Sequence, residues 1–299
     1  MMKIYDESTK NNIRKLIITG IFADDLILGQ FALKGGNALS MAHNLSERAS
    51  MDIDLSMKED IDSLTISREE LKDTLQQNIA QSLEGENLTI IDFTLNDSPR
   101  KTNNKFWGGY RITFKVVDNE EIQNNNNDID SIRKLSISLG KSEKKEMKID
   151  ISKYEFIDNA ILVDCDDDSL INVYSLTMII SEKLRAICQQ MPEYKEKMKV
   201  KTSPRPRDFY DIYTIIESKP NLGNDLMLGE IKSMMREIFR LKDVPLSLLE
   251  NVKLEDTKEF HEKDFETVLQ TIYATSHRKE FDFYYSYVCN LIEKLNLNN

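Results

Sequence analysis

Two aspartates that are two residues apart, Asp52 and Asp54, have the type and spacing of metal ligands. The segment 51–55 alternates apolar and polar residues, as a half-buried strand does, so both carboxylates are expected on one face. Two neighbouring carboxylates repel each other unless a cation lies between them. Because Mg²⁺, or Mn²⁺ in its place, binds carboxylate and phosphate oxygens, this pair predicts metal-assisted phosphoryl or nucleotidyl transfer.

The glycine pair before this segment, Gly35 and Gly36, could bring a phosphate close to the backbone. The pair follows a short apolar segment at 31–33 and precedes a helix expected at about 37–44. Glycines allow backbone amides to approach a phosphate, and the N-terminus of the next helix would point toward it. An ordinary turn is the alternative interpretation of these two glycines.

A third carboxylate lies in a later alternating segment, 147–152. Its apolar residues are expected on one face, and Lys148, Asp150 and Ser152 on the other. Asp150 could be a further metal ligand or the general base that takes a proton from an acceptor hydroxyl. The alternative is a surface ion pair with Lys148, which would contribute about 0–1 kcal/mol.

Cationic residues in the second half of the chain could bind a triphosphate. Lys183 lies on a helix expected over about 176–190, and Arg207 opens another helix. A basic stretch over 195–207, which ends at Arg207, could guide a phosphate backbone or form an exposed loop. Its members are Lys195, Lys197, Lys199, Lys201, Arg205 and Arg207. Asp208 and Asp211, which follow, could instead support a helix N-terminus through its dipole.

The composition excludes several classes of protein. The 299 residues are 40% hydrophobic, which is enough for a folded core. A net charge of −11 argues against a polybasic nucleic-acid coat, although it leaves room for a local basic groove. The three cysteines are widely spaced, and His43, His261 and His277 form no pattern, so neither a disulfide framework nor a structural zinc site is expected. We expect a cytoplasmic protein, because the sequence has no apolar signal core and no run long enough to span a membrane.

The elements that must position these residues divide the chain into two parts. Strands are expected at 31–33, 52–55, 88–95, 110–117, 135–139 and 147–152, and helices at 8–29, 37–44 and 67–82. A polar loop is expected at 118–130, and the chain beyond 176 is mainly helical. This pattern predicts an α+β fold, in which a domain with a mixed sheet flanked by helices, 1–168, precedes a mainly helical domain, 169–299. The acidic segment 164–168 would be the linker.

Four motifs together resemble those of the AbiEii-type nucleotidyltransferase toxins, which belong to the DNA polymerase β-like nucleotidyltransferase superfamily and include the MenT toxins. The first combines Lys34-Gly35-Gly36 with Arg48-x-Ser50-x-Asp52-x-Asp54. The others are Lys148-Ile149-Asp150, Ser181-Glu182-Lys183-Leu184-Arg185-Ala186 and Arg207-Asp208-Phe209-Tyr210-Asp211-Ile212-Tyr213. They follow the order of the family across residues 33–213.

The resemblance implies a role for each motif residue. Asp52, Asp54 and Asp150 would bind magnesium, and Lys183 and Asp208 would join them as catalytic residues. The set that holds the NTP would comprise Lys34, Gly35, Gly36, Ser50, Lys148 and Arg207. The family implies nucleotide transfer from an NTP to RNA, most often the 3′ acceptor end of tRNA. It also implies a cognate antitoxin in a type IV toxin–antitoxin or phage-defence system.

Some residues depart from the family pattern, and two other functions remain open. Gly36 stands where the superfamily usually has serine, Ser181 replaces an alanine, and Gln189 and Gln190 occupy a place where arginine is common. The part beyond residue 223 carries no matching motif. The same chemistry could act on a protein or a small-molecule acceptor, or the chain could be an NTP-binding regulatory module without turnover.

Overall fold

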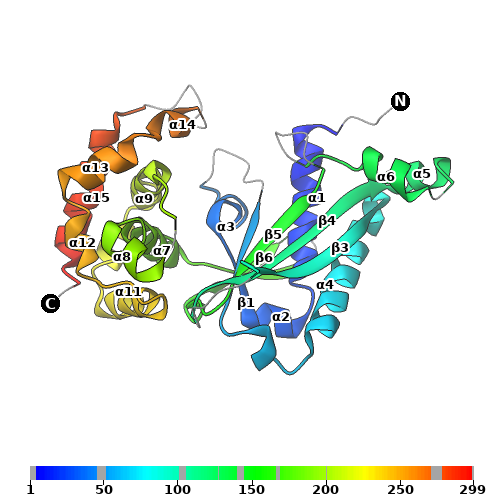
Figure 1. Cartoon of the computed structure of the whole chain (residues 1–299), viewed down its shortest axis with the longest axis horizontal. Coiled ribbons are helices and arrows are strands. Elements are labelled where there is room, and N and C mark those ends of the chain that lie inside the picture. Colours follow the sequence, from blue (N-terminus) through cyan, green and yellow to red (C-terminus); the bar gives the residue numbers. More distant parts are fainter. Residues whose placement is uncertain are drawn as a thin grey trace. The chain divides into compact units, whose positions relative to one another are not determined.

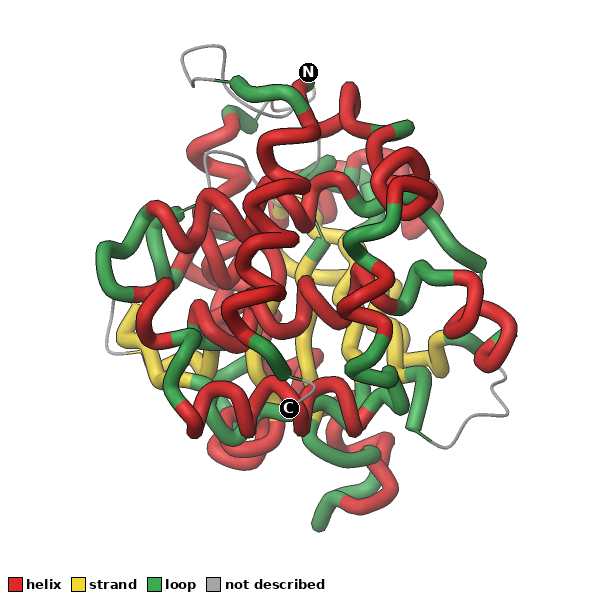
Figure 2. The backbone as a smooth tube through the Cα atoms, turned by 90° about the vertical axis from the view of Figure 1, so that its left-hand side faces the viewer, coloured by secondary structure: helices red, strands yellow, loops and turns green. Residues whose placement is uncertain are grey.

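The computed structural model describes residues 5–45, 52–100, 106–126, 128–139, 145–165, 169–199, 201–270 and 278–297. The chain forms two compact units, Met1–Asn44 with Ala49–Tyr174, and Leu45–Arg48 with Ser175–Asn299. All strands of the described residues belong to the first unit, and the described elements of the second unit are helices. Figure 2 colours the strands yellow and the helices red. The α+β class predicted from the sequence is confirmed.

A mixed sheet with strand order β3-β4-β5-β2-β1-β7-β6 forms the centre of the first unit (Figure 1). Its strands are β1 (Phe31–Lys34), β2 (Ile53–Met57), β3 (Leu88–Ser98), β4 (Gly109–Asp118), β5 (Met147–Ser152), β6 (Ile161–Cys165) and β7 (Ser169–Val173). The pairs β2–β5 and β1–β7 are parallel, and the other neighbours are antiparallel. The strands that carry the first two motifs are therefore the central ones.

Helices accompany the sheet in the first unit. They are α1 (Glu7–Ile21), α2 (Asp25–Gln30), α3 (Gly35–Met41), α4 (Arg68–Leu83), α5 (Asn119–Asn124) and α6 (Ile129–Leu135), with short 3-10 turns at Ile61–Ser63 and Glu84–Glu86. Helix α4 begins after Ser67, whose hydroxyl accepts the Glu70 amide while the Glu70 carboxylate accepts the Ser67 amide. Its apolar stripe is buried, and it packs beside α1 and β3 (Figure 1).

The single helix predicted over 8–29 is wrong, because the chain forms α1 and α2 with a break between them. Phe22 ends α1, and the Asp24 carboxylate accepts the backbone amides of Leu26 and Ile27 at 2.9 and 3.1 Å. An aspartate that satisfies free amides in this way starts a new helix. The apolar periodicity continues across the break, which is why the sequence suggested one helix.

Two further expectations are corrected between β4 and β5. The polar loop predicted at 118–130 contains α5 and the first two residues of α6, and Asp118 caps α5 by accepting the Glu120 amide at 3.0 Å. The strand predicted at 135–139 is absent from the described residues, because Leu135 ends α6 and 136–139 make only one backbone hydrogen bond to β4 among the described contacts, from Ile137 N to Val116 O at 2.8 Å. Ile137 and Leu139 are nevertheless buried, so the alternation reflected packing rather than a strand.

The first unit continues to Tyr174, whereas the sequence placed the domain boundary between 168 and 169. Strand β7 pairs with β1 through Leu33 and Val173, so it is part of the sheet. The segment expected to be a linker includes the end of β6 at Cys165, and residues 166–168 lie outside the described part.

The second unit is helical in all of its described elements. They are α7 (Leu176–Cys188), α8 (Pro192–Met198), α9 (Pro206–Glu217), α10 (Leu222–Asp225), α11 (Gly229–Leu241), α12 (Leu248–Asn251), α13 (Glu255–Glu262), α14 (Phe265–Leu269) and α15 (Phe281–Leu295). Helix α9 packs against α7 and α15, and the Phe209 ring meets that of Phe281 edge-on at 5.3 Å. This packing fixes the helices that carry the third and fourth motifs.

Candidate functional site

The strand register brings four charged residues into one row across the first unit's sheet. Lys34 is opposite Asp54 in the pair β1–β2, Asp54 is opposite Asp150 in β2–β5, and Asp150 is opposite Arg111 in β4–β5. Directly paired residues project from the same face of a sheet. The row therefore places two acids side by side with a cation on each flank.

Alternation along the central strands explains why both carboxylates face away from the core. Ile53 and Leu55 of β2 are buried at 0% and 1% exposure, and the apolar residues of β5 are buried likewise. Asp54 and Asp150 occupy the intervening positions and are partly exposed. Asp52 lies just before β2 and is exposed, and its backbone carbonyl accepts a hydrogen bond from the Asn37 side chain at 2.8 Å. Asn37, on α3, was given no role by the motif, although it makes this contact.

Position 35 requires glycine, both for its backbone conformation and for the space beside Asp54. Its φ is +68°, a conformation that side-chain-bearing residues rarely adopt, and a Cβ placed there would lie 3.0 Å from Asp54 Oδ2. The glycine thus gives the carboxylate its place beside the start of α3. Lys34, which precedes it, is buried, and its ammonium donates to Ser152 Oγ at 3.3 Å and lies 3.9 Å from a Glu155 carboxylate oxygen.

Arg111 binds both oxygens of Asp150. Its Nε donates to Oδ1 at 2.7 Å and a terminal nitrogen donates to Oδ2 at 3.1 Å, a two-point ion pair. The hydrogen bond and charge of Asp150 raise the pKa of Arg111, and the charge of Asp52 raises it further. The sequence pattern places Arg111 in a strand but does not indicate a role for it in the site. Its position on the polar face of 110–117 was the available signal.

The donor chemistry of the row fits a hard divalent cation, since Asp54 and Asp150 offer carboxylate oxygens from adjacent strands. Asp150 is engaged by Arg111, and within the described ranges no cluster of three or more His, Cys, Asp or Glu side chains is arranged to hold a metal. A cation bound to Asp150 would therefore compete with Arg111 for the same carboxylate. Ser50 lies outside the described residues, and the Lys148 ammonium is 3.9 Å from a Glu146 oxygen.

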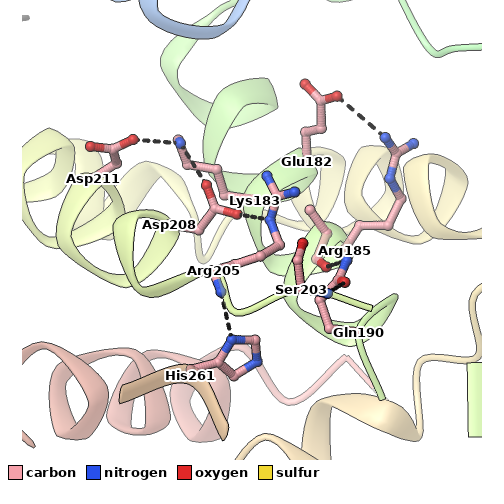
Figure 3. Close-up of polar contacts among 10 residues, drawn as sticks. Glu182, Lys183, Arg185, Gln190, Ser203, Arg205, Asp208, Asp211 and His261 are labelled. Atoms are coloured by element: carbon pink, nitrogen blue, oxygen red, sulfur yellow. Dashed lines mark hydrogen bonds and ion pairs between the residues drawn. The ribbon is translucent and has the colours of Figure 1, made fainter. Parts of the chain in front are cut away.

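A second charged cluster lies in the second unit, where α7 and α9 pack together (Figure 3). The Lys183 ammonium donates to Asp208 Oδ1 at 2.9 Å and to Asp211 Oδ2 at 2.6 Å. Two residues of different motifs, Lys183 and Asp208, are thus in direct contact. Arg207 is half-buried on the first turn of α9, and no described hydrogen bond or ion pair joins it to this cluster.

Arg205 and His261 complete the cluster (Figure 3). The Arg205 guanidinium binds the second oxygen of Asp208, and its backbone amide donates to His261 Nδ1 at 2.9 Å. The sequence indicates no function for His261 and only a helix-dipole role for Asp211. The spacing of Arg205, Asp208 and Asp211 at three-residue steps was a signal for one helical face. His261 comes from the distant helix α13 and carried no such signal.

Burial and charge act in opposite directions on these groups. Burial raises the pKa of Asp208, but Lys183 and Arg205 outweigh it and lower that pKa to about 2. Burial lowers the pKa of Lys183, yet the charges of Asp208 and Asp211 outweigh it and raise that pKa. Lys183, Arg205 and Asp208 therefore stay ionised at neutral pH. Burial lowers the pKa of His261 to about 4, so its ring is neutral and can accept the Arg205 amide.

The basic stretch and a cavity also lie in the second unit. Lys195, Lys197, Lys199 and Lys201 are exposed, and Lys197 pairs with Asp243 at 2.6 Å. A cavity of about 520 Å³ is lined by residues that include Gln190, Lys195, Thr202, Phe260, His261 and Lys263. No helix in the described part of the chain combines the length and apolar character that crossing a bilayer requires.

Comparison with known proteins identifies one family. The family model described as "Nucleotidyl transferase AbiEii toxin, Type IV TA system" matches residues 17–287, which include parts of both units. No curated protein matches the chain. A solved structure of an antigenic nucleotidyltransferase-like protein from Paracoccidioides brasiliensis matches at 14% identity, over 82% of this chain and 89% of that chain. Its TM-score of 0.30 is too low to support a structural argument.

Replacing Gly35 with alanine should destabilise the first unit. The left-handed backbone and the 3.0 Å approach to Asp54 Oδ2 both oppose a Cβ, so we expect a loss of about 1 kcal/mol or more in the free energy of unfolding. The matched control is Gly29→Ala, because nothing lies within 4 Å of a Cβ at that helical position. Urea denaturation of both variants gives the comparison, and equal stabilities would contradict the proposed constraint.

The buried neutral His261 should make stability depend on pH. Its pKa of about 4 in the folded chain is below its value of about 6.5 in the unfolded chain, so its contribution is complete above pH 6.5 and is lost as pH falls toward 4. Between pH 7 and 5 the loss attributable to His261 should be about 2 kcal/mol.

His261→Asn tests this, because its side-chain oxygen can accept the Arg205 amide but does not titrate in this range. We expect the free energy of unfolding of the variant to fall less between pH 7 and 5 than that of the unmodified chain. His43→Asn, at a half-buried histidine of the first unit, is the control. An identical pH dependence for His261→Asn and the unmodified chain would show that His261 does not titrate as described.

Proposed function

This chain belongs to the AbiEii nucleotidyltransferase toxin family of type IV toxin–antitoxin systems, and we propose that it transfers nucleotides from an NTP to RNA in a Mg²⁺-dependent reaction. The proposed acceptor is the 3′ end of tRNA. Nucleotides added there would block aminoacylation of the tRNA or the use of the tRNA in translation. The proposal places the toxin in the cytoplasm, together with an antitoxin, and gives it a role in phage defence.

The paired carboxylates of the first unit carry this proposal. Asp54 and Asp150 are directly opposite in adjacent parallel strands, and Gly35 leaves room for the Asp54 carboxylate at the start of α3. With Asp52 beside them, these residues would hold Mg²⁺, which when bound supplies Lewis-acid stabilisation of the transferred phosphoryl group. Asp150 would serve as a further oxygen ligand or accept the proton of the attacking hydroxyl. In either role Asp150 would use a carboxylate that Arg111 also binds.

Lys183 is proposed to contact the NTP, with Asp208 as its positioning residue. The two carboxylates that bind Lys183 fix its ammonium and keep it charged. Arg205 binds the other oxygen of Asp208 and thereby limits rotation of that carboxylate. Loss of Asp208 would therefore act through Lys183 and Arg205, each of which would lose a partner in a largely buried cluster.

The acceptor assignment is supported by local charge. The chain has a net charge of −11, yet the exposed lysines at 195, 197, 199 and 201 are concentrated within seven residues of sequence. A cluster of this kind can bind a phosphate backbone although the whole chain is acidic. The carboxylate chemistry would be the same for a protein or small-molecule acceptor, so the assay must offer all three classes of acceptor.

The first test is nucleotide transfer with Mg²⁺, each labelled NTP in turn, and separate fractions of total tRNA, protein and metabolites. We expect label in tRNA, and a reduction of about 100-fold or more in the Asp52→Ala/Asp54→Ala variant, because both proposed ligands are removed. The control is Asp97→Ala/Asp158→Ala, which removes two exposed acids of the same unit.

Label in the protein or metabolite fraction alone would contradict an RNA acceptor but keep nucleotidyl transfer. Bound NTP without transfer to any fraction, together with toxicity that survives in the Asp52→Ala/Asp54→Ala variant, would favour the regulatory module.

Changing Lys195, Lys197, Lys199 and Lys201 to glutamate should weaken binding of tRNA and flatten its dependence on salt, because fewer counterions are released. Filter binding over a series of salt concentrations measures both quantities. A control with Lys58, Lys219, Lys232 and Lys294 changed to glutamate has the same net charge but leaves the stretch intact. Equal weakening in the two variants would mean that overall charge, and not this stretch, governs RNA binding.

A further inference from the structure

Arg111 occupies the place where a cation would neutralise the paired acids. Its guanidinium binds both oxygens of Asp150, and Asp150 is directly opposite Asp54. Resting on the proposed function, we infer that Arg111 is an exchangeable counter-ion. It holds Asp150 while no metal is bound, and it moves to the triphosphate when the metal–NTP complex takes Asp150.

Charge along the row gives the first argument. Asp54 and Asp150 would repel each other without a positive group nearby. Lys34 flanks the pair on one side, but its ammonium also donates to Ser152 and lies 3.9 Å from the buried Glu155 carboxylate. Arg111 flanks the other side, and its two-point contact is with Asp150 itself. Arg111 therefore stands in for a cation at the acid pair.

Exposure of the ion pair gives the second argument. The side chains of Arg111 and Asp150 are 45% and 36% exposed, so water competes for both groups. Because water competes for its charged groups, an exposed ion pair separates more readily than a buried one. The Lys183–Asp208 pair differs, because those side chains are only 14% and 5% exposed. Of these two pairs, the Arg111 pair is the one suited to exchange.

The chemistry of the guanidinium gives the third argument. Arginine presents two parallel N–H donors that match a carboxylate or a phosphate equally well. Strand β4 is fixed on both sides by β3 and β5, so the transfer needs only side-chain rotation. A divalent cation on Asp150 would repel the guanidinium, whereas the negative triphosphate that arrives with it would attract it. One binding event thus supplies both the repulsion and the new partner.

The test separates metal binding from nucleotide binding. Arg111→Gln and Arg111→Lys are compared with the unmodified full-length chain, using Mn²⁺ alone as the probe and electron paramagnetic resonance as the readout. The affinity for each NTP is then measured calorimetrically at saturating Mn²⁺. The matched control is Arg133→Gln, because Arg133 also forms an exposed two-point pair, with Asp92 of β3 in the same unit.

We expect changes of opposite sign in Arg111→Gln. Mn²⁺ should bind about tenfold more tightly, since its competitor for Asp150 is gone, and NTP should bind about tenfold more weakly, since a phosphate contact is lost. Arg111→Lys keeps the charge without the two-point geometry, so its affinities for Mn²⁺ and NTP should lie between those of the unmodified chain and of Arg111→Gln. The melting temperature should stay unchanged, because the pair is exposed. Arg133→Gln should alter neither affinity.

Other results overturn the inference. Parallel loss of both affinities in Arg111→Gln would mean that Arg111 only supports the structure. Unchanged affinities, as in the control, would mean that it neither competes with the metal nor contacts the nucleotide. If the unmodified chain itself binds no Mn²⁺ and labels no acceptor, the proposed function fails and the inference fails with it. If the unmodified chain transfers nucleotide but the Arg111 variants keep its affinities for Mn²⁺ and NTP, the inference is overturned and the proposed function stands.

Discussion

The parallel pairing of β2 with β5 is the constraint on which the candidate site depends. It places Asp54 directly opposite Asp150, and the apolar residues that flank each of them along its strand are buried on the other face. The repulsion between these two adjacent carboxylates must then be offset by positively charged neighbours. Arg111 on β4 and Lys34 on β1 are in register to do so. The position of Gly35 follows from the same pairing, since the Asp54 carboxylate lies against it.

In the second unit, the charged residues neutralise one another within a single cluster. Lys183, Arg205, Asp208 and Asp211 form a balanced cluster in which both oxygens of Asp208 are bound. This cluster is largely buried, so removal of one member leaves another without its partner. The first unit's row is open to water and tolerates exchange, whereas the cluster holds its members in place. These properties suit a site that receives a cation and a cluster that fixes a single ammonium group.

Local patterns in the sequence were sufficient for the elements and for the faces of the central strands. The alternation around Asp54 and Asp150 correctly gave two acids pointing away from the core, and Ser67 with Glu70 marked the start of α4. Periodicity failed where packing and capping competed with it, as at Asp24 and in the buried segment 136–139. The roles proposed for the motif residues stay predictions, and Ser50 lies outside the described residues.

Partners from distant segments could not be predicted from one sequence. Arg111 meets Asp150 only because β4 pairs with β5 in a particular register, and His261 reaches Arg205 across 56 positions of sequence. No local rule specifies either pairing, since each depends on how separate elements pack. The motifs named Asp150 and Asp208 as acids. Their counter-ions, Arg111 for Asp150 and Lys183 with Arg205 for Asp208, are seen only in the folded chain.

The long separation between β2 and β5 also orders the events of synthesis. Asp54 and Asp150 are roughly a hundred residues apart, and the strands between them on the chain, β3 and β4, fill the other side of β5. Contacts of such long range form late, because loop closure must come first. A ribosome-bound chain that has not yet released β5 has only half of the acid pair. The acid pair is therefore assembled only after β5 has left the ribosome.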